Sequence, residues 1–111
     1  MSLIPEQWRQ QVAAILEAAQ LGTIIVTIRA RHDWRNLDNE HYESGLYSLL
    51  AEELRVSGAI YGKRHTMDEA GECYSFTFLY QPPSATGPIT LYAKLNLLPD
   101  GQVVIIYSAH T

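Results

Sequence analysis

The opening segment of the chain carries apolar side chains at helical spacing. Within residues 5–22 they recur every three or four positions, at Trp8, Val12, Ile15, Leu16 and Ala19. Pro5 suits the first turn of a helix, Glu6 suits its positive end, and Gly22 suits its C-terminal cap. The pattern predicts an amphipathic helix whose apolar stripe faces the core.

A short strand and a second helix are predicted next. Residues 23–28 read TIIVTI and are mostly β-branched, which favours a strand. The polar stretch at residues 29–44 predicts a loop. Helical spacing returns in residues 45–58, which end at Gly58, and predicts a second helix. Its inward-facing side chains are Leu46, Leu49, Leu50 and Leu54.

Beyond this helix the period of the apolar pattern changes from 3.6 to 2, which indicates strands. The strands are predicted at residues 59–65, 73–80, 89–97 and 103–110. Helices followed by a run of strands predict an α+β fold. We expect one domain over residues 1–111, with two helices packed on one face of a four- to five-stranded, mainly antiparallel sheet.

The last two strands flank LPDGQ, in which Pro99 and Gly101 suit a tight turn. A three-residue hairpin loop closing on Leu98 and Gln102 is predicted. This register places Thr90 opposite His110, Tyr92 opposite Ser108 and Lys94 opposite Ile106. It gathers four polar residues on one face, Tyr92, Lys94, Ser108 and His110. The core face then takes Leu91, Ala93, Leu95, Val103, Ile105 and Tyr107. A two-residue loop would instead move His110 to the core face.

Composition narrows the classes of protein that remain. With 47% apolar and 18% charged residues, the chain of 111 residues can build a core of its own. Its one cysteine, Cys73, lies in an apolar strand and permits neither a disulfide framework nor a zinc-binding spacing, so a cytoplasmic location and a buried Cys73 are expected. No run approaches the ~20 apolar residues of a membrane span, so no membrane partner is expected. A net charge of −4 argues against an extended basic surface that binds nucleic acid but permits a local basic cleft.

Other polar residues offer weaker candidates. Arg29, Arg31 and Arg35 surround Trp34, which is compatible with a nucleic-acid contact or with a solvated loop, and the loop is favoured. The histidines and acidic residues show no spacing that pairs them as metal ligands, so no metal is expected. No glycine-rich loop follows a strand, so no cofactor is expected.

The C-terminal hairpin resembles that of RelE-like messenger-RNA-cleaving toxins, most nearly the MqsR-type branch. The resemblance is carried by Tyr92 and Lys94 in one strand and by Ser108 and His110 in the next, with Ala109 where that branch usually has an aromatic residue. It covers roughly the last quarter of the chain. It implies a small metal-independent ribonuclease that acts without a cofactor and binds a partner antitoxin.

Metal-free cleavage of RNA requires a base for the 2′-hydroxyl, a cation for the charge that builds on phosphorus, and an acid for the leaving oxygen. His110 carries an imidazole, a group that suits an acid or a base. Lys94 suits the phosphate, and Tyr92 suits base stacking or proton donation. Arg31, Lys63 and Arg64 are expected to supply further cations that contact the sugar–phosphate backbone of the RNA. Taken singly, each of these side chains is equally typical of a solvent-facing position on a half-buried sheet.

A second class of function fits the same sequence. The chain could be a non-enzymatic interaction module, such as an inhibitor or immunity-type protein or a homodimer subunit. Its contact surface would be the aromatic strand at residues 73–80 together with the open face of the sheet. The acidic net charge favours this class, because proteins that block nucleases often present acidic surfaces.

Overall fold

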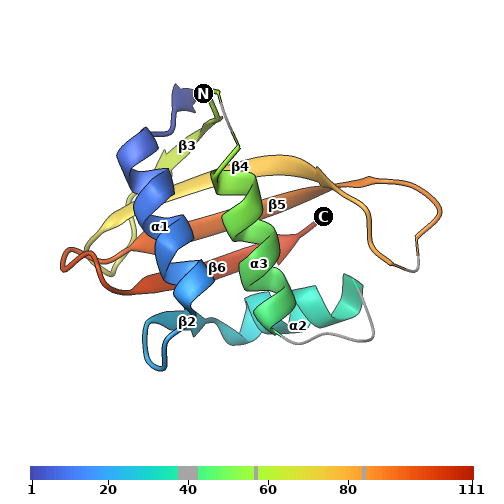
Figure 1. The fold of residues 1–111 in the computed structure, drawn as a ribbon, viewed down its shortest axis with the longest axis horizontal. Helices are drawn as coiled ribbons and strands as arrows, with labels where there is room; N and C mark the ends of the chain where they lie inside the picture. The colour runs from blue at the N-terminus through green and yellow to red at the C-terminus, as the bar shows by residue number, and fades with distance from the viewer. Residues whose placement is uncertain (38–42, 57, 84) are drawn as a thin grey trace.

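A mixed β-sheet with helices packed against it forms the body of the protein (Figure 1). The computed structural model describes residues 1–37, 43–56, 58–83 and 85–111. In these residues, six strands lie in the order β1-β3-β4-β5-β6-β2 and three helices are present. The elements are β1 (Ser2–Leu3), α1 (Glu6–Ala18), β2 (Ile24–Val26), α2 (Ile28–Leu37), α3 (Glu43–Leu54), β3 (Tyr61–His65), β4 (Glu72–Tyr80), β5 (Ile89–Leu97) and β6 (Val104–His110). The α+β class predicted from the sequence is confirmed.

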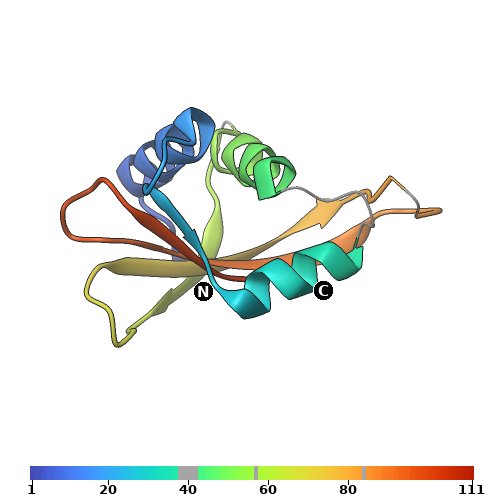
Figure 2. The same ribbon diagram turned by 90° about the horizontal axis from the view of Figure 1, so that it is seen from below.

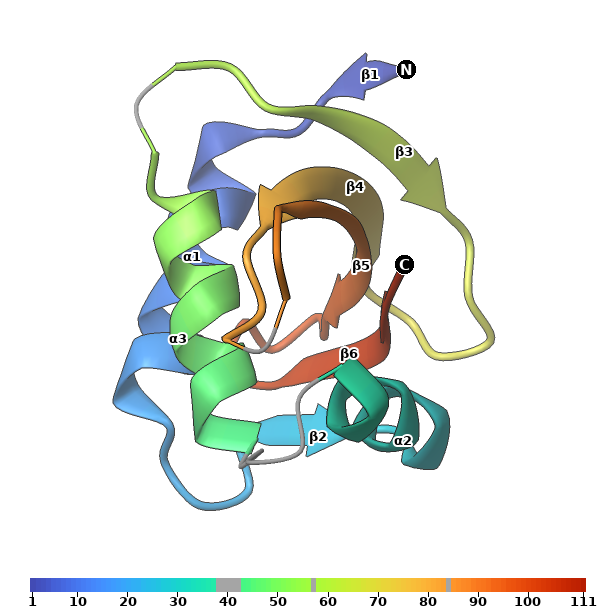
Figure 3. The same cartoon turned by 90° about the vertical axis from the view of Figure 1, so that its right-hand side faces the viewer.

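Helices α1 and α3 lie side by side on one face of the sheet (Figure 2). The sheet curves strongly, and both helices lie inside the curve (Figure 3). Trp8 and Val12 of α1 belong to the same buried core as Leu91 and Leu95 of β5, as the helical stripe predicts. The indole of Trp8 also donates a hydrogen bond of 2.9 Å to the carbonyl oxygen of Glu72. Helix α1 is therefore a central part of the core.

Arg9 joins the ends of α1 and α3. Its side chain is buried, and its guanidinium donates hydrogen bonds to the carbonyl oxygens of Leu54, Val56 and Gly58 at 3.0–3.3 Å. The last carbonyl groups of a helix have no partner within the helix. Arg9 therefore supplies donors where α3 ends and the chain turns toward β3. None of the described helices has the length and apolar character needed to cross a membrane.

Helix α2 corrects the prediction of a loop at residues 29–44. The hydroxyl of Thr27 accepts a hydrogen bond of 3.1 Å from the backbone N–H of Ala30, which caps the helix at the end of β2. Ala30 and Trp34 lie four residues apart and are both buried, and the Trp34 ring lies 5.6 Å from that of Tyr80. Two buried residues in a polar segment are too few for a clear helical period. Residues 38–42 of the predicted loop lie outside the described residues.

The sheet has one short edge strand, β1, that was not predicted, and its other edge strand, β2, lies within the strand predicted at residues 23–28. β1 pairs antiparallel with β3, and β2 pairs parallel with β6. Four of the five strand pairings among the described residues are antiparallel, so the prediction of a mainly antiparallel sheet is confirmed, whereas the predicted number of four to five strands is one or two too low. A two-residue strand and a parallel partner 80 residues away leave no local pattern in the sequence, since Ile24 pairs with Val104.

The β5–β6 hairpin corrects the predicted register. The backbone N–H of Leu98 bonds to the carbonyl of Val103 at 2.9 Å, so the loop has four residues and does not close on Gln102. Leu97 therefore lies opposite Val104, which is an odd register. A β-bulge then restores an even register, so that Lys94 lies opposite Ser108 and Tyr92 lies opposite His110. The core side chains of β6 are Val104, Ile106 and Ala109, in place of the predicted Val103, Ile105 and Tyr107.

Candidate active site

The sheet face opposite α1 and α3 carries most of the polar strand residues, and we call it the open face. Strand alternation and pairing place its members on four strands. They are Lys63 and His65 of β3, Cys73, Ser75, Thr77 and Leu79 of β4, Thr90, Tyr92, Lys94 and Asn96 of β5, and Ile105, Tyr107, Ser108 and His110 of β6. These positions hold two lysines and two histidines and no acidic residue, although the chain has a net charge of −4. The strand positions of the open face therefore carry two cations and no carboxylate, whereas the other six Lys and Arg residues of the chain lie elsewhere.

Tyr92 and His110 form an aromatic pair at one end of the open face. They lie directly opposite each other on β5 and β6, and their ring centroids are 5.1 Å apart with a tilt of 32° between the planes. The Nδ1 atom of His110 is 2.8 Å from the carbonyl oxygen of Thr111 and donates to it when it carries the proton. In that tautomer of the neutral ring, Nε2 carries the lone pair that can accept a proton.

Lys94 lies between this pair and a second aromatic ring. Its Nζ atom is 5.8 Å from the centroid of the Tyr107 ring, which is within the range of a cation–π contact. Tyr107 is the extra residue of the bulge, and its hydroxyl donates a hydrogen bond of 2.7 Å to the Glu69 carboxylate. Among the described residues Lys94 forms no salt bridge. The Lys94 ammonium group therefore contacts an aromatic ring and no described carboxylate, so it is available to bind an anion.

His65 and Ser75 form a third polar contact on the open face. The Nε2 atom of His65 is 2.7 Å from the hydroxyl oxygen of Ser75. Partial burial lowers the pKa of His65, and the nearby charges of Lys94 and Lys63 lower it further. His65 was not among the site residues predicted from the sequence. The alternation of Lys63 and His65 along β3 is the signal that places both on one face.

The predicted site residues divide between the open face and other surfaces. Tyr92, Lys94 and His110 share the open face, where Tyr92 pairs with His110 and Lys94 is a diagonal neighbour of His110 at about 7–8 Å. Lys63 lies on the same face. Arg64 lies on the opposite face, with its guanidinium 5.9 Å from the ring centroid of Tyr74. Arg31 lies on α2 and pairs with Glu43. The functional roles of all six remain predictions.

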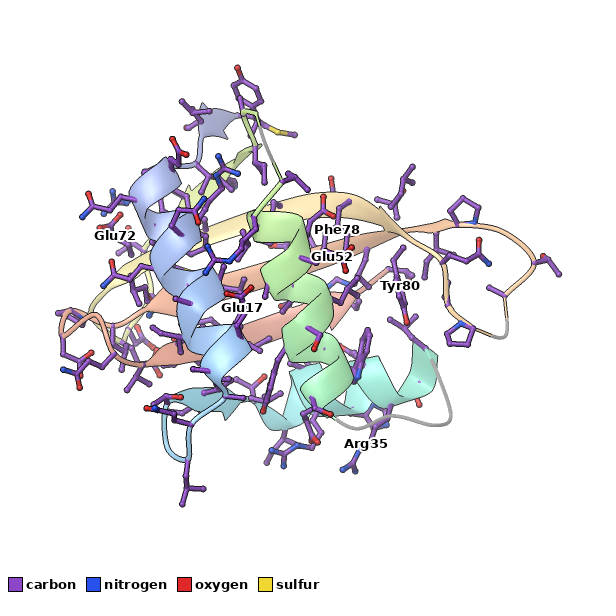
Figure 4. The ribbon with its side chains drawn as sticks, viewed as in Figure 1. Glu17, Arg35, Glu52, Glu72, Phe78 and Tyr80 are labelled. Carbon is purple, nitrogen blue, oxygen red and sulfur yellow. The ribbon has the colours of Figure 1, made fainter. Side chains whose placement is uncertain are left out.

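A hollow on the helix side offers no comparable chemistry. It has a volume of about 550 Å³ and is lined by Glu17 of α1 and by Glu52 and Arg55 at the end of α3 (Figure 4). Arg55 bonds to the Glu17 carboxylate at 2.6 Å, so its charge is already matched. Among the described residues no group of three or more His, Cys, Asp or Glu side chains could hold a metal ion. The open face therefore holds the better candidate site.

Comparison with known proteins adds no family. No protein-family model, curated protein or solved structure matches the chain. Any functional assignment therefore depends on the residues of the open face.

Proposed function

We propose that this protein is a small metal-independent ribonuclease of the RelE-like toxin kind, with its active site at Tyr92, Lys94 and His110. The observation that carries the proposal is that these three residues share one face of the sheet. The Tyr92 and His110 rings pair at 5.1 Å, and Lys94 lies on the same face, two residues along β5 from Tyr92. An imidazole, a cation and a phenol within reach of one phosphodiester are the groups that metal-free RNA cleavage needs.

The proposed reaction is attack by the neighbouring 2′-oxygen. His110 Nε2 removes the proton of the 2′-hydroxyl, and the 2′-oxygen forms a bond to phosphorus. The bond from phosphorus to the 5′-oxygen breaks, which leaves a 2′,3′-cyclic phosphate on one product. The departing 5′-oxygen takes a proton from Tyr92 or from water, and Lys94 stabilises the negative charge on the phosphoryl oxygens. No cofactor takes part in this scheme.

The acidic net charge is compatible with RNA as a substrate because the charge is distributed unevenly. Acidic residues of the described part lie on the helices, in the turns or on the helix side of the sheet, as Glu17, Glu52 and Glu72 illustrate (Figure 4). The open-face positions of β3 to β6 contain none. A local basic surface can bind a phosphate even when the whole protein is acidic.

The decisive experiment uses the purified protein, single-stranded RNA and a metal chelator. We expect cleavage by the wild type and a loss of about 10²-fold or more in His110→Ala, the usual scale for a positioned acid or base. Lys94→Ala should also lose activity while its folding stability stays nearly unchanged. His32→Ala is the matched control, because that imidazole is exposed on α2. If the wild type does not cleave RNA, or if His110→Ala matches it, the proposal is wrong.

The second candidate function is a non-enzymatic interaction module, and the net charge of −4 favours it. One of its two predicted contact surfaces must be corrected. Tyr74, Phe76 and Phe78 of β4 are buried in the core, so this strand can offer a partner only the side chains that it presents on the open face. A partner would then bind the open face, and so would an antitoxin of the ribonuclease. Expression separates the two functions, because an active ribonuclease arrests growth of its host unless a partner is supplied, and His110→Ala relieves the arrest.

A further inference from the structure

A row of polar residues crosses the open face from β3 to β6. Lys63 of β3 lies opposite Ser75 of β4, Ser75 lies opposite Lys94 of β5, and Lys94 lies opposite Ser108 of β6. Neighbouring strands are separated by about 4.8 Å, so two strand spacings place the Cα atoms of Lys63 and Lys94 about 10 Å apart. The two lysines thus mark two separate positions along one line.

The β3 end of this row is accessible and basic. Lys63 is exposed and forms no salt bridge among the described residues. His65 follows it on the same face and bonds to Ser75, and the charges of Lys63 and Lys94 both act on its imidazole. Glu69, the acidic residue that approaches the open face from the β3–β4 connection, is held by Tyr107. The Lys63 ammonium group is therefore exposed and available to bind an anion that Lys94 does not bind.

We propose that Lys63 is a second phosphate-binding residue and that the ligand is single-stranded RNA, which crosses the open face from β6 to β3. The proposal rests on the ribonuclease function for the identity of the nucleic acid. Single strands are favoured because unpaired bases can stack on a ring such as Tyr92, whereas the bases of a duplex are hidden from it. The RNA strand would place one phosphate at Lys94 and a later one at Lys63.

The separation of the two lysines predicts that binding depends on the length of the ligand. The Cα atoms of the two lysines lie about 10 Å apart, and the proposal places a different phosphate of the RNA at each of them. A dinucleotide has only one phosphate between its two nucleosides. A dinucleotide should therefore engage the Lys94 end alone, whereas an octanucleotide should reach both lysines. Each phosphate that a single strand contacts contributes about 0.7 to the slope of log affinity against log salt.

The test is a binding measurement by fluorescence anisotropy with 2′-O-methyl RNA, which lacks the free 2′-hydroxyl and cannot be cleaved. Lys63→Ala should weaken octanucleotide binding about fourfold near physiological salt and lower the salt slope by about 0.7. It should leave dinucleotide binding unchanged. Arg64→Ala is the matched control, because it removes the same charge from the next residue of β3 but on the opposite sheet face. Its effect on either ligand should be less than about twofold.

Several outcomes would overturn the inference. These are equal losses in Lys63→Ala and Arg64→Ala, equal losses for the short and the long ligand, or no octanucleotide binding by the wild type. Binding of polyglutamate in place of RNA would mark the open face as a surface for an acidic protein and would also refute the proposal. If the wild type binds the octanucleotide through Lys63 but does not cleave RNA, the inference holds and the ribonuclease function alone fails.

Discussion

The hydroxyl of Tyr107 on β6 donates a hydrogen bond of 2.7 Å to the carboxylate of Glu69, 38 residues earlier in the chain. Glu69 belongs to the connection between β3 and β4, so the bond fastens that connection to the opposite side of the open face. Gly71 in the same connection has a φ of 137°, and a Cβ atom there would lie 2.5 Å from the side-chain oxygen of Asn96. The connection thus packs closely on β5 and supports the ring that faces Lys94.

This bond makes a part of the folding stability dependent on pH. The hydrogen bond from Tyr107 lowers the pKa of Glu69. The hydrogen bond therefore contributes fully to folding stability above the ordinary carboxyl pKa of 4.5. This contribution is lost as the pH falls through the lower pKa that Glu69 has in the folded protein. Burial, together with the bond to Glu69, raises the pKa of Tyr107 to about 12, so the contribution is also lost as the pH rises from about 10 toward 12.

Tyr107→Phe tests this dependence, because it removes the hydroxyl and keeps the ring. We expect its urea midpoint to lie below that of the wild type at neutral pH. The two midpoints should converge as the pH falls below the lowered pKa of Glu69, where its carboxyl group is protonated in both proteins. A difference that stays constant between neutral and acid pH would show that Glu69 does not respond to Tyr107. Glu69→Gln removes the carboxyl group and should likewise weaken the dependence of folding stability on pH in the acid range.

Trp8 offers a test of the core. It is 2% exposed, its ring meets Tyr74 edge to face at 5.0 Å, and its N–H bonds to the Glu72 carbonyl. Trp8→Ala should destabilise the protein by about 3–5 kcal/mol in denaturant unfolding. Trp8→Phe keeps a ring and should lose less, although it leaves the Glu72 carbonyl without that donor. A near-zero change in Trp8→Ala would mean that α1 is peripheral to folding.

Cys73 is predicted to react slowly with thiol reagents. It is buried on the open-face side of β4, and burial raises the pKa of its thiol to about 11. The thiolate is the nucleophilic form, so at neutral pH little of it is present and access to it is restricted. Labelling should be slow in the native protein and fast in denaturant. Rapid native labelling would contradict the buried position of this strand.

Tyr92 can be divided into its ring and its hydroxyl. If the ring stacks on a base, Tyr92→Phe should keep RNA binding, whereas Tyr92→Ala should lose about 1–3 kcal/mol of binding free energy. If the hydroxyl donates the proton to the leaving oxygen, Tyr92→Phe should also lower the cleavage rate by about 10². Binding and single-turnover cleavage measured on the same variants distinguish the two roles. Equal binding by Tyr92→Ala and wild type would exclude stacking.

The amino-acid sequence by itself determined the elements whose pattern is long and regular. The stripe that begins at Trp8 predicts α1, and the alternation of Leu91, Ala93 and Leu95 predicts the core face of β5. Burial of Cys73 also follows from its place in an apolar strand. These features depend on neighbours in sequence, because the periods of 3.6 and 2 arise from the geometry of a single helix or strand.

The meeting of Tyr92, Lys94 and His110 was predicted, but for an incorrect reason. The predicted three-residue loop sets an even register, whereas the observed four-residue loop sets an odd one. The bulge at Tyr107 then returns His110 to the open face, directly opposite Tyr92. A bulge forms where two strands must satisfy both a turn and a buried face, so the pattern of neither strand alone reveals it.

Only the tertiary structure decided the features that rely on distant partners, which are the pairing of the predicted strand β2 and the existence of helix α2. β2 pairs with β6 across about 80 residues, and α2 is stabilised where Trp34 packs near Tyr80. The same holds for the cations, since Arg64 and Lys63 are neighbours in sequence but lie on opposite faces of β3. Which face of a strand is open depends on where the helices pack, and that is fixed by the burial of apolar surface from the whole chain.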